Sequence, residues 1–276
     1  MNEIKNMVKW ALEEDIGAGD ITAQLIDVNQ QGHAVILARE PAVVCGRAYA
    51  DEIFRQVDDK LLVNWLVEEG SYQPKPGIWV EIKGSLRSIL TAERTALNFL
   101  QTLSAVASKT KCYVDILQGY PTRILDTRKT IPGLRWAQKY AVRCGGGVNH
   151  RMGLYDEFLI KENHIESMGS ISRAISAALA GQLNKPIIVE VQNIQEFQEA
   201  HAFDVQRILL DNFSDEMIEE VIACNHNPRR NIEVSGGIDE TRLLALAKMG
   251  VDFVSVGDLT KSIRAIDLSL LIKDEA

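Results

Sequence analysis

The sequence has no CxxC pair, no run of 18 apolar residues and no excess of positive charge. Its four cysteines, at positions 45, 112, 144 and 224, are too scattered for a zinc site or a disulfide framework, which predicts inert thiols. Without a long apolar run, the chain is predicted not to span a membrane. A pI near 5.3 argues against general binding to nucleic acid or to a membrane surface, because phosphate-rich surfaces require a basic protein face.

Several familiar catalytic signatures are also missing. No Ser-His-Asp elbow, no cysteine nucleophile motif and no GxGxxG turn occurs in the sequence. Residues 1–15 are charged and amphipathic, which is typical of a helix and not of a signal peptide. Together with the scattered cysteines, this predicts a protein of the reducing cytoplasm.

The second half of the chain alternates apolar runs with helical segments. The apolar centres lie roughly 20 to 35 residues apart, the spacing of β-α units, and strands that are apolar throughout indicate a parallel sheet covered on both faces. The runs are residues 123–127, 158–161, 186–191, 207–212, 231–237 and 253–258. Because a complete eight-stranded barrel takes about 250 residues, we expect an incomplete parallel α/β barrel of about six strands.

The segments between these runs are predicted to be helices. They are residues 132–143, 170–181, 194–202, 214–225 and 239–249. Residues with short polar side chains, which cap helix N-termini, stand at the start of four of them. These are Ser170, Asn193, Ser214 and Asp239.

The first 104 residues predict a separate α+β sandwich domain. Helices are expected at 3–15, 48–57 and 88–104, and strands at 32–39, 41–46, 61–70 and 78–85. The stretch SYQPKPG at 71–77 predicts a turn. The apolar segment 267–273 is expected to return to this domain as a strand or short helix. The predicted domains are therefore 1–104 with 266–276, and 105–265, packed firmly because no flexible linker separates them.

Positive charge is concentrated in one stretch of this acidic protein. Between residues 123 and 151 lie seven Arg or Lys residues and one acid, Asp126. Three of the basic residues repeat at helical spacing, which predicts a mostly surface-exposed helix face: Arg135, Lys139 and Arg143. Loops at the ends of buried strands commonly hold ligands. We therefore interpret the loop residues that flank this helix as a pocket for a multiply charged anion: Arg128, Lys129, His150 and Arg151.

Each predicted strand of the barrel ends in a chemically active residue. These residues are Asp126 with Arg128 and Lys129, Lys161, Glu190, Asp211, Ser235 with Gly236 and Gly237, and Gly257. In α/β barrels the C-terminal strand ends face the active site. Glu190 and Asp211 are suited to Mg²⁺, to sugar hydroxyls or to a developing positive charge. They are also suited to salt bridges with Lys129 and Lys161, and the two interpretations are compatible.

Two glycine turns follow the last two strands. Ser235-Gly236-Gly237 precedes a helix expected to start near Asp239, and such a turn presents backbone N–H groups to a phosphate. Gly257-Asp258 is a candidate for a second phosphate turn. Phosphate contacts beside an anion pocket indicate a phosphorylated sugar donor and an acidic acceptor. A non-catalytic anion-binding barrel is the alternative outside the enzymes.

Long segments of the sequence resemble the quinolinate phosphoribosyltransferase family, also called carboxylating nicotinate-nucleotide pyrophosphorylases. The most specific is TRKTIPGLRWAQKYAVRCGGGVNHRMGLYDEFLIKENHI at 127–165, and EEDIGAGDIT, AERTALNFLQTLS, ILLDN, EVSGGI and SVGDLT match further blocks. The resemblance implies a sandwich domain and an open barrel, assembled as a homodimer or higher oligomer. It implies that quinolinate and phosphoribosyl pyrophosphate react with Mg²⁺ to give nicotinate mononucleotide, pyrophosphate and CO₂ in de novo NAD synthesis.

The resemblance also implies roles for individual residues. The quinolinate-binding positions match Arg128, His150, Arg151 and Lys161, with Thr127 and Lys129 beside them. Arg94 matches an arginine that enters the partner subunit's site. Glu190 and Asp211 match carboxylates that lie near the ribose and bind Mg²⁺, either directly or through water. The expected catalytic residues are Lys129, Lys161, Glu190 and Asp211. The phosphate contacts match Ser235, Gly236, Gly237 and Gly257.

Three positions depart from the family pattern. Asp258 stands where Ala is usual, Lys261 replaces a frequent His, and Ile188 replaces an acid common two residues before Glu190. These departures bear on the expected phosphate and metal contacts and leave the reaction class unchanged. The alternative enzyme is a phosphoribosyltransferase of the same fold that acts on another acidic heterocycle, as in the molybdenum-operon proteins.

Overall fold

The computed structural model describes residues 2–181 and 184–273, which form two compact units. The first unit comprises the residues up to Lys109 with the segment from Ser262 onward, and the second runs from Thr110 to Lys261. The first boundary falls inside the long helix α3 (Leu86–Ile116). The prediction that this helix ends at 104 is wrong, because Val106, Ala107 and Tyr113 continue its buried apolar face.

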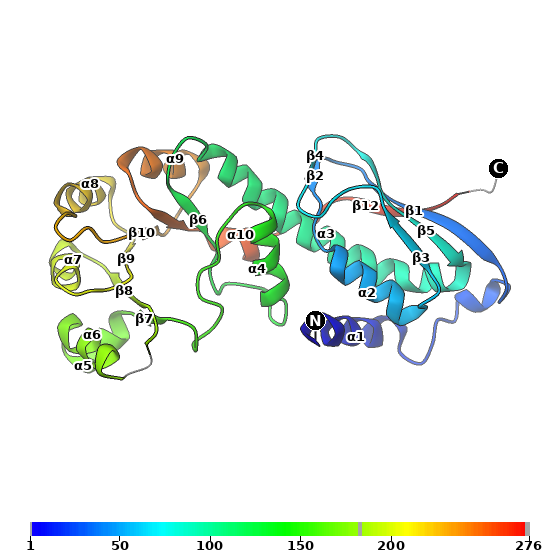
Figure 1. The fold of residues 1–276 in the computed structure, drawn as a ribbon, viewed down its shortest axis with the longest axis horizontal. Coiled ribbons are helices and arrows are strands. Elements are labelled where there is room, and N and C mark those ends of the chain that lie inside the picture. The colour runs from blue at the N-terminus through cyan, green and yellow to red at the C-terminus, as the bar shows by residue number, and fades with distance from the viewer. Residues whose placement is uncertain (1, 182–183, 274–276) are drawn as a thin grey trace. The chain divides into compact units, whose positions relative to one another are not determined.

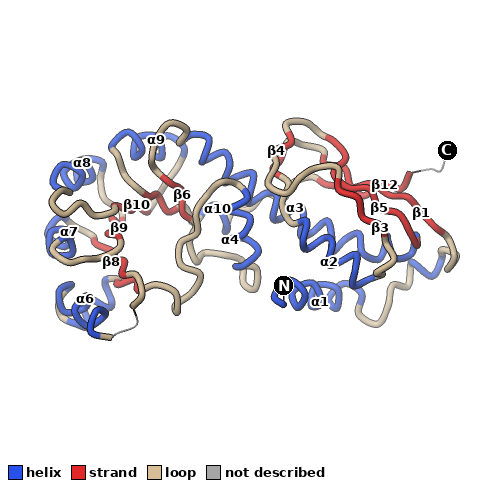
Figure 2. Tube along the Cα trace, viewed as in Figure 1, coloured by secondary structure: helices blue, strands red, loops and turns tan. Residues whose placement is uncertain are grey.

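The first unit is a four-stranded antiparallel sheet with helices against one face (Figures 1 and 2). The strand order is β12–β1–β5–β3, with β1 (Gln31–Ala38), β3 (Leu62–Trp65), β5 (Gly77–Ser85) and β12 (Leu268–Lys273). The other elements are α1 (Asn2–Ile16), α2 (Arg47–Val57) and the 3₁₀ turn η1 (Ala23–Leu25). Because β12 pairs with β1, the predicted return of 267–273 to this unit is confirmed.

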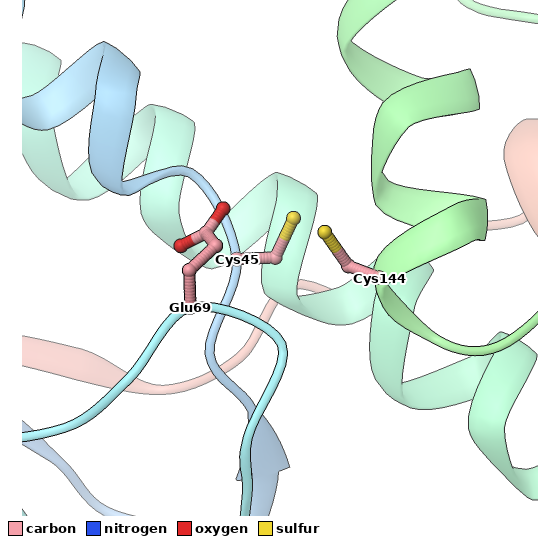
Figure 3. Close-up of side chains that lie close together, drawn as sticks. All are labelled: Cys45, Glu69 and Cys144. Carbon is pink, nitrogen blue, oxygen red and sulfur yellow. The ribbon is translucent and has the colours of Figure 1, made fainter.

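Two short strands complete the first unit. The strand predicted at 41–46 is only β2 (Ala42–Val43), and its partner β4 (Tyr72–Gln73) lies in the segment predicted to be a turn. Strands of two residues are too short to show an alternating pattern. Beside them lies the Glu69 side chain (Figure 3). Its carboxylate accepts hydrogen bonds from the backbone N–H groups of Gly46 and Arg47, at 3.0 and 3.2 Å. A carboxylate at this position stabilises the N-terminus of α2.

The second unit contains a six-stranded parallel sheet in the order β6–β11–β10–β9–β8–β7. Its strands are β6 (Arg123–Leu125), β7 (Phe158–Ile160), β8 (Ile187–Val191), β9 (Arg207–Asp211), β10 (Ile232–Ser235) and β11 (Phe253–Ser255). The sheet curves, with α6 to α9 along its outer side (Figure 1). Since β6 and β7 are both edge strands, the sheet does not close. The expected open α/β architecture of about six strands is confirmed.

The helices of the second unit follow the predicted segments closely. They are α4 (Arg135–Cys144), α5 (Glu162–Met168), α6 (Ile171–Ala180), α7 (Ile194–His201), α8 (Asp215–Cys224), α9 (Glu240–Met249) and α10 (Asp258–Lys261). Only the short α5 and α10 were not predicted. All four expected N-caps are confirmed, since each side chain accepts a hydrogen bond from the N–H group three residues later: Ser170, Asn193, Ser214 and Asp239.

Two further observations concern the chain as far as the structure describes it. None of the described helices is long and apolar enough to cross a membrane. No disulfide joins any of the four cysteines, all of which lie within the described residues.

Candidate active site

The C-terminal ends of the parallel strands surround a cavity of about 300 Å³ in the second unit. Nine of the predicted site residues line it: Thr127, Arg128, Lys129, His150, Arg151, Lys161, Glu190, Asp211 and Ser235. Leu159, Leu209, Glu233 and Ser255 complete the lining. The residues come from every strand of the sheet or from the loop that follows it, because parallel strands place all their C-terminal ends at one edge.

A second cavity, of about 530 Å³, adjoins the first. The two share Thr127, Lys129, Asp211, Ser235 and Ser255. The second cavity adds the predicted phosphate contacts Gly236, Gly237 and Gly257, and also Asp258 and Lys261. Twelve of the thirteen predicted substrate-binding residues therefore line one of the two cavities. The thirteenth, Arg94, lies on an exposed part of α3 in the first unit.

The Gly236-Gly237 turn has a backbone that favours glycine. Gly236 has φ +96°, and a Cβ atom there would lie 2.2 Å from the side-chain oxygen of Asn212. Gly237 has φ +56°. Within the described part of the chain, no protein hydrogen bond uses the backbone N–H groups of Gly236 and Gly237. Since helix α9 begins three residues after Gly237, these donors and the helix dipole together form a suitable site for a phosphate.

Gly257 leaves room for Lys129 between the two cavities. A Cβ atom on Gly257 would lie 3.1 Å from Cδ of Lys129 and 3.4 Å from Oγ1 of Thr127. The backbone of Lys129 is held on both sides, because its N–H donates to Thr127 Oγ1 and its carbonyl accepts from Thr260 Oγ1. Lys129 thus lies where an anion in either cavity would meet its ammonium group.

Glu190 and Asp211 have different partners. The Nζ atom of Lys161 lies 2.5 Å from Oε2 of Glu190, at the ends of the neighbouring strands β7 and β8. Asp211 instead accepts a hydrogen bond of 2.8 Å from the Ser235 hydroxyl, its register partner on β10. The salt bridge considered for Glu190 and Lys161 is therefore present. An entering anion would compete with Glu190 for Lys161.

His150 lies in the anion pocket as a neutral ring. Burial, followed by the positive charges of Arg207, Lys139 and Arg151, lowers its pKa from 6.5 to about 3. Its Nδ1 atom accepts a hydrogen bond of 2.7 Å from the N–H of Arg151, so the proton of the neutral ring is on Nε2. At neutral pH, His150 therefore offers a substrate a hydrogen-bond donor and no positive charge. The cations of the pocket are Arg128, Lys129, Arg151 and Lys161.

A buried acid and its arginine were missed by sequence reasoning. Glu233, in the middle of β10, is fully buried and lines the first cavity. Its Oε2 atom lies 2.7 Å from Nε of Arg207 on β9, and its Oε1 lies 3.5 Å from Nε2 of His150. Burial raises the pKa of Glu233, and the charge of Arg207 opposes that shift. The signal available in the sequence was a charged residue inside an apolar strand, which requires a partner.

The prediction that Arg135, Lys139 and Arg143 are mostly exposed is wrong for two of the three. Arg143 is exposed, but Arg135 is half-buried and donates to the carbonyl of Met152 at 3.2 Å. Lys139 is fully buried and paired with Asp126, which is also fully buried. Helical spacing places residues on one side of a helix. The spacing does not predict which residues on that side are buried by other segments of the chain.

The carboxylates of the site are suited to Mg²⁺ only if water and substrate phosphates supply the other oxygen ligands. Neither unit, in its described part, brings three His, Cys, Asp or Glu ligand atoms within 4.8 Å of one another. Mg²⁺ usually keeps several waters and binds through one or two carboxylates plus substrate phosphates. Asp211, which lines both cavities, and Glu190 are the residues suited to that mode of binding.

Two family models match the chain and together span most of it. Residues 20–104 match the N-terminal domain of quinolinate phosphoribosyl transferase, and residues 106–271 match its C-terminal domain. The chain belongs to this family. All the residues that line the two cavities lie in the part of this chain that matches the C-terminal domain, and that part also carries the whole six-stranded sheet.

Curated relatives and solved structures agree with the family assignment. The chain is 39% identical over 268 residues to a probable carboxylating nicotinate-nucleotide pyrophosphorylase of Synechocystis, covering 96% of this chain and 90% of the relative. It is 35% identical over 294 aligned positions to decarboxylating quinolinate phosphoribosyltransferase 1b of Nicotiana tabacum, covering 99% and 83%. The nicotinate-nucleotide pyrophosphorylase of Francisella tularensis superimposes with a TM-score of 0.95 at 47% identity, over 99% of this chain and 96% of that one.

Of the three positions that depart from the quinolinate phosphoribosyltransferase pattern, two line the second cavity and one is buried in the core. Asp258 and Lys261 both line the second cavity, so each can act on a bound phosphate. Ile188 is fully buried in β8, two residues before Glu190 and therefore on the same face of the strand. It lies in the core and is not among the residues that line either cavity.

Proposed function

We propose that this protein transfers the phosphoribosyl group of phosphoribosyl pyrophosphate to the ring nitrogen of quinolinate, with loss of CO₂. The products are nicotinate mononucleotide, pyrophosphate and CO₂, a step of NAD biosynthesis. The observation that carries this proposal is the pair of adjoining cavities. One contains four cationic side chains suited to two carboxylates, and the other has a glycine turn at a helix N-terminus suited to a phosphate.

In the first cavity, Arg128, Arg151 and Lys161 take up the two carboxylates of quinolinate. A guanidinium group binds a carboxylate through two parallel hydrogen bonds, which fixes the plane of the ring as well as its position. His150 adds a neutral N–H donor at Nε2. Burial, followed by the charge of Arg128, lowers the pKa of Arg151, so a bound carboxylate relieves a repulsion already present in the empty pocket.

In the second cavity, Gly236, Gly237 and Gly257 hold the phosphate of the ribose. Lys129, which lines both cavities, is then beside the leaving pyrophosphate. Asp211 and Glu190 are the residues that would hold Mg²⁺, which would supply further positive charge for the leaving group. Charged groups that are fixed before reaction stabilise a transition state without having to reorganise.

The reaction then follows from where these groups lie. The ring nitrogen attacks the anomeric carbon as its bond to pyrophosphate breaks, and the carboxylates of Glu190 and Asp211 stabilise the positive charge that develops on the ribose. The new nitrogen–carbon bond makes the ring nitrogen cationic. That nitrogen stabilises the electron pair left when the adjacent C–CO₂ bond breaks, and a proton replaces CO₂ on the ring carbon.

The proposal includes a homodimer in which Arg94 of one subunit completes the anion pocket of the other. Arg94→Ala and Lys161→Ala variants should each lose most of the wild-type activity, because each removes one cation that contacts the anion. Mixing them should restore about a quarter of the wild-type activity, since half of the random dimers have one complete site. No recovery in a mixture shown by native mass spectrometry to contain hybrid dimers would contradict the role of Arg94 in the partner's site.

The direct test of the reaction uses purified protein with quinolinate, phosphoribosyl pyrophosphate and Mg²⁺. Nicotinate mononucleotide and CO₂ should appear in equal amounts, and both should form at least tenfold more slowly with the Lys161→Ala variant. Omitting Mg²⁺ should lower the rate strongly. Turnover of a different acidic heterocycle in preference to quinolinate would support the alternative enzyme instead. The proposed compartment is the cytoplasm, which fractionation of the source cells tests.

A further inference from the structure

The loop that carries His150 and Arg151 runs alongside the edge strand β6. Val148 N–H donates to the carbonyl of Ile124 at 2.8 Å, and Asp126 N–H donates to the carbonyl of Val148 at 3.2 Å. These bonds form a parallel bridge between Leu125 and Val148. Residues 148–151 therefore leave the sheet edge in the same direction as β6, toward the C-terminal ends of the strands.

The peptide groups of His150 are then held from both sides by one buried ion pair. The N–H of His150 donates to Oδ1 of Asp126 at 2.9 Å, and Nζ of Lys139 donates to the carbonyl of His150 at 2.8 Å. Asp126 and Lys139 are in direct contact with each other. The amide of Asn149 donates to the other oxygen of Asp126 and to the carbonyl of Lys139, at 2.8 Å for the latter.

A gain in folding stability is a weak explanation for the presence of this buried ion pair. Taking two charges out of water is unfavourable, and replacing a buried ion pair by apolar residues of similar size is often neutral or stabilising. Burial raises the pKa of Asp126 and lowers that of Lys139, and their mutual attraction opposes both shifts. What an apolar pair could not provide is an acceptor and a donor matched to the N–H and carbonyl of one residue.

We propose that the Asp126–Lys139 pair positions the anion-binding residues His150 and Arg151 by clamping the peptide groups of His150. This inference rests on the proposed function, because it concerns the pocket for quinolinate. Taken together, Asp126 and Lys139 carry no net charge, so the pair does not change the net charge of that pocket. The effect of the pair on the substrate is instead transmitted through the backbone to the two side chains that line the cavity.

The proposal predicts a selective effect on one substrate. A misplacement of about 1 Å in a binding group can lower a rate by about 100-fold. His150 and Arg151 line the first cavity and not the second, so quinolinate binding should suffer. The glycine turn of the second cavity belongs to β10 and α9. Phosphoribosyl pyrophosphate binding should therefore be preserved.

The test compares two variants of the full-length protein. Lys139→Met removes the donor to His150 and leaves the carboxylate of Asp126 buried without its cation, which should lower the melting temperature by about 10 °C. Asp126→Asn/Lys139→Met removes both charges but keeps an oxygen that can accept from the His150 N–H. Most of the lost stability should then return. Lys248→Met on the exposed face of α9 is the control for the same loss of charge.

Binding is measured for each substrate separately by calorimetry, and KM and kcat are measured for both. We expect the double variant to raise the Kd and KM for quinolinate at least tenfold, while the Kd for phosphoribosyl pyrophosphate changes less than twofold. Recovery of quinolinate binding together with stability would overturn the positioning role, as would an equal loss for both substrates. A wild-type protein that does not bind quinolinate would instead overturn the proposed function.

Discussion

The two adjoining cavities offer an anion different kinds of binding groups. The first uses long side chains that come from separate strands and loops, Arg128, Arg151 and Lys161 among them. The second has glycines at two turns, where the lack of a side chain leaves the backbone groups open to a ligand. Flat carboxylates match the planar fork of a guanidinium group, whereas a phosphate, with oxygens in several directions, matches N–H donors at a helix N-terminus.

This difference indicates how the binding groups of each cavity are held in position. Ordering a long side chain has an entropic cost, so the first cavity needs supports such as the Asp126–Lys139 pair and the Glu233–Arg207 pair. The Gly236-Gly237 turn joins β10 to α9, and its N–H groups belong to the backbone, so no long side chain has to be ordered when they bind. The first cavity should therefore fail when one side chain is lost, and the second when its backbone is forced to move.

The largest effect is expected from Arg151→Ala. This change removes a charge-assisted contact to a carboxylate, worth about 1.5–3 kcal/mol. The kcat/KM for quinolinate should fall by about 10- to 150-fold, while the KM for phosphoribosyl pyrophosphate stays close to the wild-type value. Steady-state kinetics with each substrate varied in turn provides the measurement. Arg173→Ala, at an exposed arginine on α6 that lines neither cavity, is the control, and full activity of Arg151→Ala would refute the anion-pocket assignment.

The next largest effect is expected from Gly236→Ala. The added Cβ would lie 2.2 Å from the Asn212 side chain at φ +96°, so the turn must move or accept strain of about 1–3 kcal/mol. The KM for phosphoribosyl pyrophosphate should rise about tenfold, and quinolinate binding should be unchanged. Gly250→Ala has a similar φ of +87° but meets nothing within 4 Å, so it should affect stability alone. Equal kinetics for the two variants would contradict a phosphate role for the Gly236 turn.

The pH dependence of folding stability tests whether His150 in the first cavity is neutral, unlike the cations around it. The folded pKa of His150, about 3, lies below its unfolded value of 6.5, so between these values the unfolded state binds one more proton. Stability from this group is therefore present above pH 6.5 and is lost as the pH falls toward 3, by up to about 1.4 kcal/mol per pH unit.

Urea denaturation of the wild type and of His150→Asn at pH 4–7 measures this term. The wild type should lose stability faster than the variant below pH 6.5. The quinolinate KM of the wild type should also be flat between pH 6 and 8, because His150 stays neutral throughout. A KM that rises through pH 6.5 would mean that a protonated imidazole binds the carboxylate.

The smallest effect is expected from Asp258→Ala, in the second cavity. Removing a carboxylate that lines a phosphate site relieves a repulsion, which for a partly exposed group is worth about 0.2–1 kcal/mol. The KM for phosphoribosyl pyrophosphate should fall by about two- to fivefold at low salt, with less change at high salt. Glu219→Ala on α8, an exposed acid, controls for net charge. An increase in KM would show that Asp258 assists the phosphate turn.

Much of this arrangement was predictable because the relevant signals are local. Apolar runs, N-cap residues and strand-end polar residues each appear within a few consecutive positions, and twelve of the thirteen predicted substrate-binding residues line the two cavities. The helices α5 and α10 and the strand β4 were missed, because elements of two to seven residues are too short to show a period.

The amino-acid sequence by itself determined the order of strands and helices, the glycine turns and the chemical types at the strand ends. Only the tertiary structure decided which charges are buried and which partners they have. Lys139 and Arg143 lie one turn apart on α4, yet one is fully buried against Asp126 and the other is exposed. The physical reason is that burial depends on segments distant in the chain, and burial sets whether a charge requires a partner.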